Sequence, residues 1–192
     1  MENNEWNKLN SKDGYEYYIL EKDKPKDKPI ISLSSIRTEA RNINPSRQIK
    51  ILQIDVPAKF IDILAVKNRE LVGFLEASIL EDGKTASMSM QTQLAKMNLP
   101  EGIDDTKLNI HRHNGAIFVD EEHRRHGIAK NMMNELFKKL KEHGVNKLSV
   151  HDIKEDAIEL YKTTGAEFEN EKEATYNIEE MVLKGPENTP EI

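Results

Sequence analysis

The segment from Arg124 to Ala129 combines positive charge with the start of a helix, and this combination can bind phosphate. Arg124 and Arg125 carry formal charge, Gly127 lets a ligand approach the backbone closely, and an apolar helical pattern begins at Ile128. A helix N-terminus adds N–H groups that lack intrahelical acceptors, and the helix dipole is positive there. The segment therefore indicates a phosphate or pyrophosphate site. The same spacing is also typical of a helix that starts after a charged loop.

The helix that follows this segment is the clearest periodic element of the chain. Its apolar stripe consists of Ile128, Met132, Met133, Leu136, Phe137 and Leu140. Gly144 lies where a C-terminal cap is expected. A second helix is predicted over residues 154–163, because Asp152 and Glu155 have the spacing of a capping box and Gly165 follows the last turn.

Strand-like patterns account for most of the remaining chain. Residues 60–90 are expected to form an antiparallel meander, with a tight turn at the Asp-Gly dipeptide of positions 82 and 83. A short helix is predicted from Leu33 to Ile43. The predicted extended runs are Tyr15–Leu20, Ile49–Val56, Phe60–Val66, Leu71–Leu80, Ala86–Met90, Lys107–Val119, Leu148–Val150, Ala166–Phe168 and Tyr176–Leu183.

Length and composition limit the classes of protein that fit. We expect an N-terminal extension over residues 1–45, with a charged, proline-containing linker and a short helix, a main domain over 46–184 and a polar tail over 185–192. The absence of cysteine excludes disulfides and a catalytic thiol. The net charge of −6 argues against a general binder of nucleic acid or anionic membrane. No apolar run approaches the ~20 residues that span a bilayer, and we expect a cytoplasmic protein.

The run Val119-Asp-Glu-Glu-His-Arg-Arg-His-Gly-Ile-Ala129 resembles the signature of the Gcn5-related N-acetyltransferases, the GNAT superfamily. In that family a strand ending in Val precedes Arg/Gln-x-x-Gly-x-Gly/Ala at the start of a long helix. Residues 157–168, Ala-Ile-Glu-Leu-Tyr-Lys-Thr-Thr-Gly-Ala-Glu-Phe, resemble the family's Ala-x-x-Leu-Tyr-x-x-x-Gly-Phe signature. The resemblance covers about residues 58–183. It implies an α+β fold, the GNAT acyl-CoA N-acyltransferase fold, with a mixed, mostly antiparallel central sheet flanked by helices.

The resemblance also implies acetyl-CoA as co-substrate. Backbone groups of Phe118 and Val119 would face its pantetheine arm. Tyr161 would be the general acid that protonates the departing CoA thiolate, and a phenol with a pKa of ~10 is a suitable donor. A core tyrosine is the alternative interpretation of Tyr161. The pyrophosphate cradle implied by the resemblance consists of Arg124, Arg125, His126, Gly127, Ile128, Ala129 and Lys130.

Three residues are candidates for the base that takes a proton from an attacking amine: Glu76, His111 and His113. Imidazole titrates near neutrality, which suits this task, and strand alternation places the two histidines on one face. Their His-x-His spacing would also suit a metal, but the sequence offers no third ligand, so we expect no metal. Ordinary surface histidines are the other interpretation.

The expected function is transfer of an acetyl group from acetyl-CoA to a primary amine by direct attack, without a covalent enzyme intermediate. The expected partners are acetyl-CoA and an amine-bearing acceptor, either a small molecule or a protein, with a homodimer left open as the assembly. The alternative is a catalytically weak or inactive GNAT-fold module that retains CoA binding. Lys154 motivates it, because the family often has Asn at this position. The absence of a clear base and the unusual N-terminal third also motivate it. Residues 84–107, which are longer than a simple hairpin return, are a further departure from the family pattern.

Overall fold

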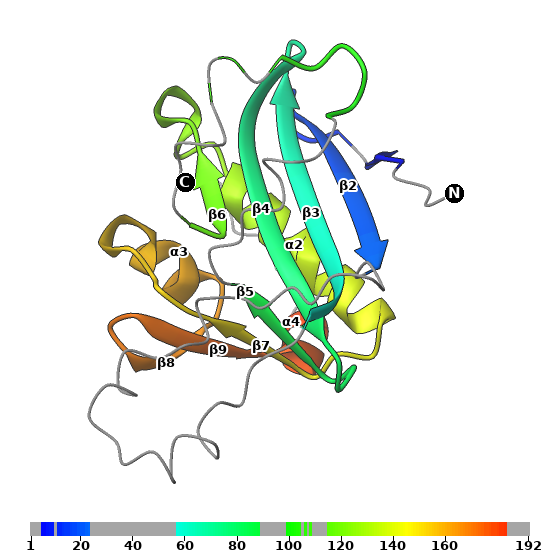
Figure 1. Cartoon of the computed structure of the whole chain (residues 1–192). Coiled ribbons are helices and arrows are strands. Elements are labelled where there is room, and N and C mark those ends of the chain that lie inside the picture. The colour runs from blue at the N-terminus through cyan, green and yellow to red at the C-terminus, as the bar shows by residue number, and fades with distance from the viewer. Residues whose placement is uncertain are drawn as a thin grey trace, which may run out of the picture.

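The structure of the protein, a computed structural model, describes residues 5–9, 11–23, 57–88, 99–104, 106, 108 and 115–183 (Figure 1). The predicted helix Leu33–Ile43, the predicted strand Ile49–Val56 and both candidate histidines, His111 and His113, lie outside these residues. The strands are β1 (Asn7–Lys8), β2 (Glu16–Asp23), β3 (Pro57–Lys67), β4 (Glu70–Leu80), β5 (Thr85–Met88), β6 (Ile117–Val119), β7 (Lys147–Val150), β8 (Glu167–Asn170) and β9 (Glu173–Asn177). The helices are α2 (Ile128–Glu142), α3 (Ile158–Thr163) and α4 (Ile178–Leu183), with short 3-10 turns η5 (Glu121–His123) and η6 (Glu155–Ala157).

The described strands form one mixed sheet in the order β1-β2-β3-β4-β5-β7-β9-β8, with β6 also paired to β4. Only the β5–β7 pair is parallel. The mixed, mostly antiparallel architecture expected from the sequence is therefore confirmed. The meander of residues 60–90 is confirmed as β3, β4 and β5, which pair consecutively in antiparallel fashion.

β5 and β6 occupy the same side of β4, one after the other. Ser87 of β5 lies opposite Ser78, and Ile117 of β6 lies opposite Leu75. The two strands thus pair with successive parts of the same edge of β4. Of the strand predicted from Lys107 to Val119, the structure shows Ile117–Val119 as β6, and most of the preceding residues lie outside the described part of the chain.

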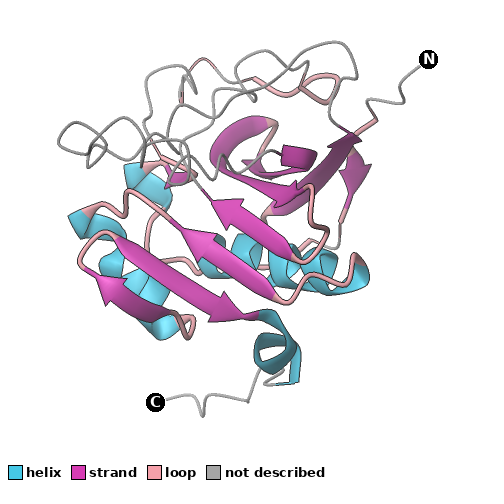
Figure 2. Ribbon diagram, turned by 60° about the horizontal axis from the view of Figure 1, so that its bottom comes forward, coloured by secondary structure: helices cyan, strands magenta, loops and turns pink. Residues whose placement is uncertain are grey.

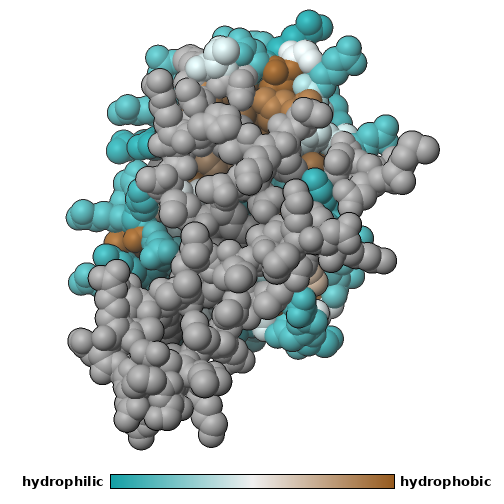
Figure 3. Space-filling view, viewed as in Figure 1, coloured by the Kyte–Doolittle hydropathy of each residue, from teal (hydrophilic) through white to brown (hydrophobic). Residues whose placement is uncertain are grey.

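The core lies between α2 and one face of the sheet. All six residues of the predicted α2 stripe are buried. Alternate residues of β3 and β4, such as Ile63 and Leu75, pack in the same cluster as this stripe. Their neighbours Leu64 and Phe74 belong to a second cluster on the opposite face. Burial of apolar surface contributes roughly 25 cal/mol per Å², so these two clusters hold the sheet in place. Hydrophilic residues cover most of the rim of the described surface in Figure 3.

Two predictions for the C-terminal part were wrong. The run Tyr176–Leu183 is not a single strand, because β9 ends at Asn177 and α4 begins at Ile178 (Figure 2). Ile178 is fully buried, and its N–H donates to the carbonyl oxygen of Asn146 at 2.9 Å, outside the strand ladder. The contact of α4 with α2 then outweighs the strand pattern of this short run.

The second predicted helix, over residues 154–163, is present but divided, and its predicted cap is the second wrong prediction. It consists of η6 followed by α3, and Gly165 adopts the left-handed conformation just past its end. Asp152 does not cap it. Lys154 occupies the N-cap position of η6, and no side chain makes a capping hydrogen bond there. None of the described helices is long and apolar enough to cross a membrane.

We expect Gly165→Ala to lower the free energy of unfolding by about 1–2 kcal/mol, because Gly165 has φ +93° and left-handed backbone is unfavourable for other residues. A Cβ atom there would also lie 2.8 Å from Cε of Met181. Urea unfolding measures the change.

Gly14→Ala is the matched control, since Gly14 has φ +77° but a Cβ atom there would meet nothing within 4 Å. Gly165→Ala should lower the free energy of unfolding by more than Gly14→Ala does. Adding Met181→Ala to the Gly165→Ala variant should remove this difference. An equal loss in both single variants would show that the contact with Met181 has no effect.

Candidate functional site

The loop between β6 and α2 presents a row of backbone N–H groups. Two of its residues have left-handed backbone, Arg125 with φ 65° and Gly127 with φ 73°. The first hydrogen bond of α2 runs from the N–H of Asn131 to the carbonyl oxygen of Gly127 at 2.9 Å. Within the described residues, no acceptor contacts the N–H groups of residues 125–130. Such a concave run of N–H groups before a helix is suited to an anion.

Gly127 is required here for its conformation and for the space beside it. A Cβ atom at this position would meet nothing within 4 Å, so the room next to the backbone is open. Arg125 adopts a similar conformation at a cost of about 1–2 kcal/mol, because it carries a Cβ atom. Strained backbone of this kind is often found at functional sites.

Arg124 is held by the protein on three sides. Its Nε–H donates to the carbonyl oxygen of Val119 at 3.1 Å, and Cζ lies 5.6 Å from the centre of the Phe118 ring. Its Nη1 lies 3.8 Å from Oδ2 of Asp156. Arg124 therefore connects β6 to the segment that precedes α3. Arg124, Arg125 and Lys130 are all exposed, so their charges are also accessible to an anion.

Four side chains from distant parts of the chain meet beside this loop. The hydroxyl of Tyr15 lies 3.3 Å from Nδ1 of His123, and Nζ of Lys67 donates to the same hydroxyl at 3.5 Å. The Tyr15 and His126 rings are 6.4 Å apart. Nδ1–H of His126 donates to the carbonyl oxygen of Arg124 at 2.9 Å, so its Nε2 is directed away from that carbonyl. The contribution of Tyr15 and Lys67 could not be found from local sequence patterns.

One edge of β6 has no strand beside it in the described part of the chain. The N–H of Glu76 donates to the carbonyl oxygen of Ala116, and the N–H of Asp120 donates to that of Val72. Hydrogen-bonded pairs alternate with non-hydrogen-bonded pairs along an antiparallel ladder, so Phe118 also directs its N–H and C=O toward β4.

By the same alternation, Ile117 and Val119 direct their backbone N–H and C=O groups away from β4, toward the other edge of β6. β7 pairs with β5 and β9, not with β6. The geometry therefore favours Ile117 and Val119 as the residues with available backbone groups, in place of the expected Phe118 and Val119.

Tyr161 is buried on α3, which lies between β6 and the β7–β9–β8 part of the sheet in Figure 1. Ala157 and Ile158 pack against the same core cluster, so the three residues share the inward face as their spacing predicts. Burial raises the pKa of the Tyr161 phenol, and the neighbouring Tyr176 raises it further. Tyr161 is therefore a protonated hydrogen-bond donor at neutral pH.

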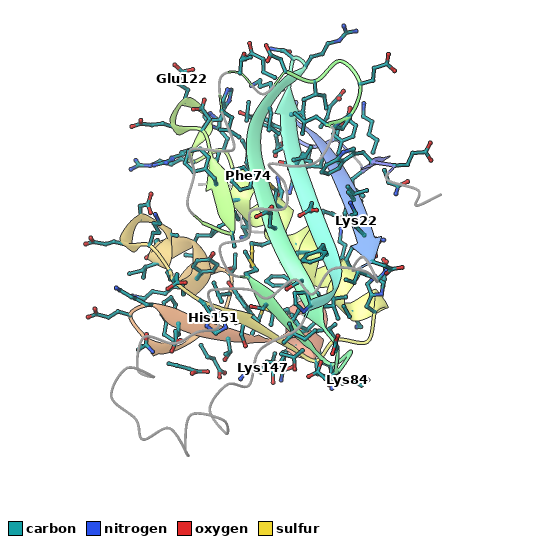
Figure 4. The ribbon with its side chains drawn as sticks, viewed as in Figure 1. Lys22, Phe74, Lys84, Glu122, Lys147 and His151 are labelled. Carbon is teal, nitrogen blue, oxygen red and sulfur yellow. The ribbon has the colours of Figure 1, made fainter. Side chains whose placement is uncertain are left out.

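A second carboxyl group lies beside Glu76. Asp62 of β3 is its direct cross-strand partner, and the two residues are only 1% and 2% exposed. Strand alternation places them on the face opposite α2, the face that carries Phe74, which is labelled in Figure 4. Burial raises the pKa of Asp62, Glu76 raises it further, and Lys22 opposes the shift. The sequence signal for Asp62 was an acidic residue inside an apolar strand, and our sequence analysis missed it.

The loop of residues 124–130 directly follows β6, and an exposed ion pair between Arg124 and Asp156 joins the loop to the segment that precedes α3. Glu76 is joined to the start of β6 through its backbone. Among the described residues, no group of three His, Asp or Glu side chains could hold a metal ion.

Comparison with known proteins gives a match to one family. The model of the acetyltransferase (GNAT) family matches residues 28–166. No curated protein matches the sequence.

Several solved structures resemble the chain at low identity. Gcn5 of Tetrahymena is 9% identical over 73% of this chain and 79% of its own, with a TM-score of 0.43. An aminoglycoside 6′-N-acetyltransferase complexed with coenzyme A is 14% identical over 83% of this chain and 97% of its own, with a TM-score of 0.43. The spermidine/spermine N-acetyltransferase SpeG from Vibrio cholerae is 12% identical over 72% and 76%, with a TM-score of 0.44.

We expect stability to fall as the pH rises above about 10, the ordinary pKa of tyrosine in an unfolded chain. Folded Tyr161 keeps its proton because its pKa is raised, whereas the unfolded chain loses it, so unfolding releases a proton. Tyr161→Phe should flatten this dependence by up to about 1.4 kcal/mol per pH unit. Urea unfolding at several alkaline pH values measures it. If the stability of the variant and of the wild type fell equally steeply with pH, the raised pKa of folded Tyr161 would be contradicted.

Proposed function

Because this chain belongs to the GNAT acetyltransferase family, we propose that it is an N-acetyltransferase that transfers an acetyl group from acetyl-CoA to a primary amine. The observation that supports this function best is the pairing of two backbone features. The N–H groups of residues 125–130 have no acceptor among the described residues, and the adjoining edge of β6 has no neighbouring strand there. A ligand with a pyrophosphate and an extended amide-containing arm, as CoA has, matches both features.

In this proposal the backbone holds the co-substrate. N–H groups from Arg125 to Lys130 bind the pyrophosphate, and the exposed Arg125 and Lys130 add charge to it. Amide groups of the pantetheine arm pair with the backbone of Val119 and Ile117, as an added strand would. Because the arm runs from the loop back along β6, the thioester lies beyond Ile117, next to Glu76.

Tyr161 is proposed to act on the leaving group. The amine nitrogen attacks the thioester carbonyl, the C–N bond forms and the C–S bond breaks. The phenol of Tyr161 gives its proton to the sulfur and regains one from nitrogen, so that CoA leaves as a neutral thiol. The raised pKa keeps the phenol protonated until the thiolate develops.

Glu76 is the described candidate for the base, and His111 and His113 remain proposals outside the described residues. The backbone hydrogen bond from Glu76 to Ala116, 2.7 Å long, keeps this residue beside the start of β6. A carboxylate there is adjacent to the expected position of the thioester, where an amine must lose a proton before or during attack.

A CoA-binding module without turnover is the second candidate, favoured by Lys154 in place of the asparagine that is frequent in the family. The exposed Lys154 directly precedes η6 and thus the segment that carries Tyr161. Binding of acetyl-CoA with no acetyl transfer to any member of a broad amine panel would select this candidate.

The binding half of the proposal is tested with Gly127→Val. The branched side chain strains the left-handed backbone and fills the open space beside it. We expect acetyl-CoA at a hundred times its Kd to stabilise the wild type by about 2.7 kcal/mol and to leave the variant unchanged. Thermal unfolding with and without acetyl-CoA measures this.

The matched control is Gly83→Val, because Gly83 has φ +63° and equally open surroundings but lies in the β4–β5 turn. Both variants should lose similar intrinsic stability, and only the control should keep its response to acetyl-CoA. A normal response in Gly127→Val would rule out the loop as the pyrophosphate site.

The catalytic half is tested with Tyr161→Phe, which removes the hydroxyl and keeps the ring that packs in the core. We expect kcat to fall by about 10²–10⁴-fold while the affinity for acetyl-CoA stays within twofold, because the phenol acts only on the leaving group. Release of the CoA thiol, followed with a thiol reagent, measures kcat. Unchanged turnover would show that Tyr161 is only a core residue.

A further inference from the structure

The hairpin turn between β1 and β2 ends beside the loop that joins β6 to α2. Two backbone hydrogen bonds between Lys12 and Tyr15, each 2.9 Å long, close this turn. Its central residues, Asp13 and Gly14, have φ 54° and 77°, and positive φ at both positions is typical of a tight two-residue hairpin turn. The backbone of Tyr15 is therefore fixed by the turn as well as by the sheet.

A second tight turn, between β3 and β4, lies next to the first. Its residues Asn68 and Arg69 have φ 52° and 67°, so it has the same kind of backbone. The register of β2 and β3 places Lys67, the last residue of β3, next to Tyr15 on the neighbouring strand. Two fixed turns thus bring the side chains of Tyr15 and Lys67 to the same end of the sheet.

The side chains of Lys67, Tyr15 and His123 form a continuous chain of donors and acceptors. Nζ of Lys67 donates to the Tyr15 hydroxyl at 3.5 Å and lies 4.5 Å from the centre of the Tyr15 ring. The hydroxyl oxygen accepts from this ammonium group, so its own O–H is left to donate to Nδ1 of His123, 3.3 Å away. Tyr15 is only 2% exposed, and hydrogen bonds shielded from water in this way are strengthened.

Two histidines that contact Tyr15 flank the strained residue of the loop. The centre of the Tyr15 ring lies 5.9 Å from that of His123 and 6.4 Å from that of His126. Nδ1 of His126 in turn lies 2.9 Å from the carbonyl oxygen of Arg124 and 3.3 Å from that of His123. Arg125, with its left-handed backbone, is enclosed by these contacts. Such a conformation persists only where the surrounding structure fixes it, and Tyr15 contacts both sides of it.

The same hairpin also contacts the first turn of α2. Nζ of Lys12 donates to Oδ1 of Asn131 at 3.1 Å, and Nδ2 of Asn131 donates to the hydroxyl of Tyr17 at 3.1 Å. The N-terminal strands therefore contact the loop at its start, through His123, and the helix just after its end, through Asn131.

We propose that Tyr15 is a positioning residue for the co-substrate, which acts through His123 and His126 to keep the N–H groups of residues 125–130 directed toward the CoA pyrophosphate. This inference rests on the proposed N-acetyltransferase function. Without the Tyr15 hydroxyl, His123 loses its donor and the strained backbone at Arg125 can relax in the free protein. Part of the binding energy of acetyl-CoA is then used to restore the loop, so the observed affinity falls.

The experiment measures the Kd of acetyl-CoA by calorimetric titration for the wild type and for Tyr15→Phe, which removes the hydroxyl and keeps the buried ring. We expect Kd to rise by about 3–10-fold, the effect of one lost hydrogen bond. The matched control is Tyr18→Phe. Tyr18 lies on the opposite face of β2, and its hydroxyl donates to Glu16 at 2.8 Å, so the control loses a hydrogen bond away from the loop. Its Kd should stay within twofold of the wild type.

Thermal unfolding without ligand separates positioning from stability. Both variants should unfold about 2–4 °C below the wild type, because each loses one hydrogen bond. A role of Tyr15 in the stability of the fold alone would therefore give the two variants the same affinity for acetyl-CoA.

A double-variant cycle tests the route through His123. We expect His123→Ala to raise Kd by about as much as Tyr15→Phe does, and Tyr15→Phe to cause no further rise in the His123→Ala background. In phosphorus NMR at saturating CoA, the pyrophosphate resonances of Tyr15→Phe should move from their positions in the wild-type complex, whereas those of Tyr18→Phe should not.

The outcomes separate this inference from the proposed function. If the wild type binds acetyl-CoA and Tyr15→Phe binds it within twofold as tightly, or if the effects of Tyr15→Phe and His123→Ala simply add, the positioning role is wrong while the proposed function stands. If the wild type does not bind acetyl-CoA, the proposed function is wrong and the positioning role is overturned with it.

Discussion

A free edge in the middle of the sheet determines how the candidate site is arranged. Backbone N–H and C=O groups need partners, and a strand inside a sheet normally finds them on both sides. Among the described strands, β6 pairs with β4 alone, because β7 pairs with β5 and β9. Arg124 supplies a partner for one exposed carbonyl, that of Val119. No described strand pairs with the rest of this edge, so its geometry is suited to a ligand that can pair as a strand does.

In the loop that follows β6, the backbone conformation directs the N–H groups, whereas the charged side chain of Arg124 contacts other parts of the protein. Left-handed backbone at Arg125 and Gly127 turns the chain so that consecutive N–H groups meet no acceptor among the residues that the structure describes. The arginine expected to supply charge, Arg124, instead connects β6 to Asp156 ahead of α3. An anion held here would be recognised mainly by N–H groups, whose directions are set by the fold and not by flexible side chains.

The register of β3 and β4 has an electrostatic consequence for the opposite face of the sheet. It places Asp62 across from Glu76, so that burial and the neighbouring Glu76 raise the pKa of Asp62. Slipping the pairing by one residue would turn one of these groups toward α2 and the apolar core. The apolar contacts of β3 and β4 therefore hold the two carboxyl groups opposite each other.

The sequence alone determined the elements whose signals are local. The α2 helix and the β3–β4–β5 meander follow from periodicity and turn residues, and the resemblance around Gly127 identified the family signature. Tertiary structure decided what depends on partners distant in the chain. Short runs such as Tyr176–Leu183 have no decisive period, so packing of α4 on α2 determined their conformation. Strand register decides that the backbone groups of Ile117, and not those of Phe118, point away from β4. It also places Asp62 opposite Glu76. Register is set by contacts across the whole sheet, and no local stretch of sequence encodes it.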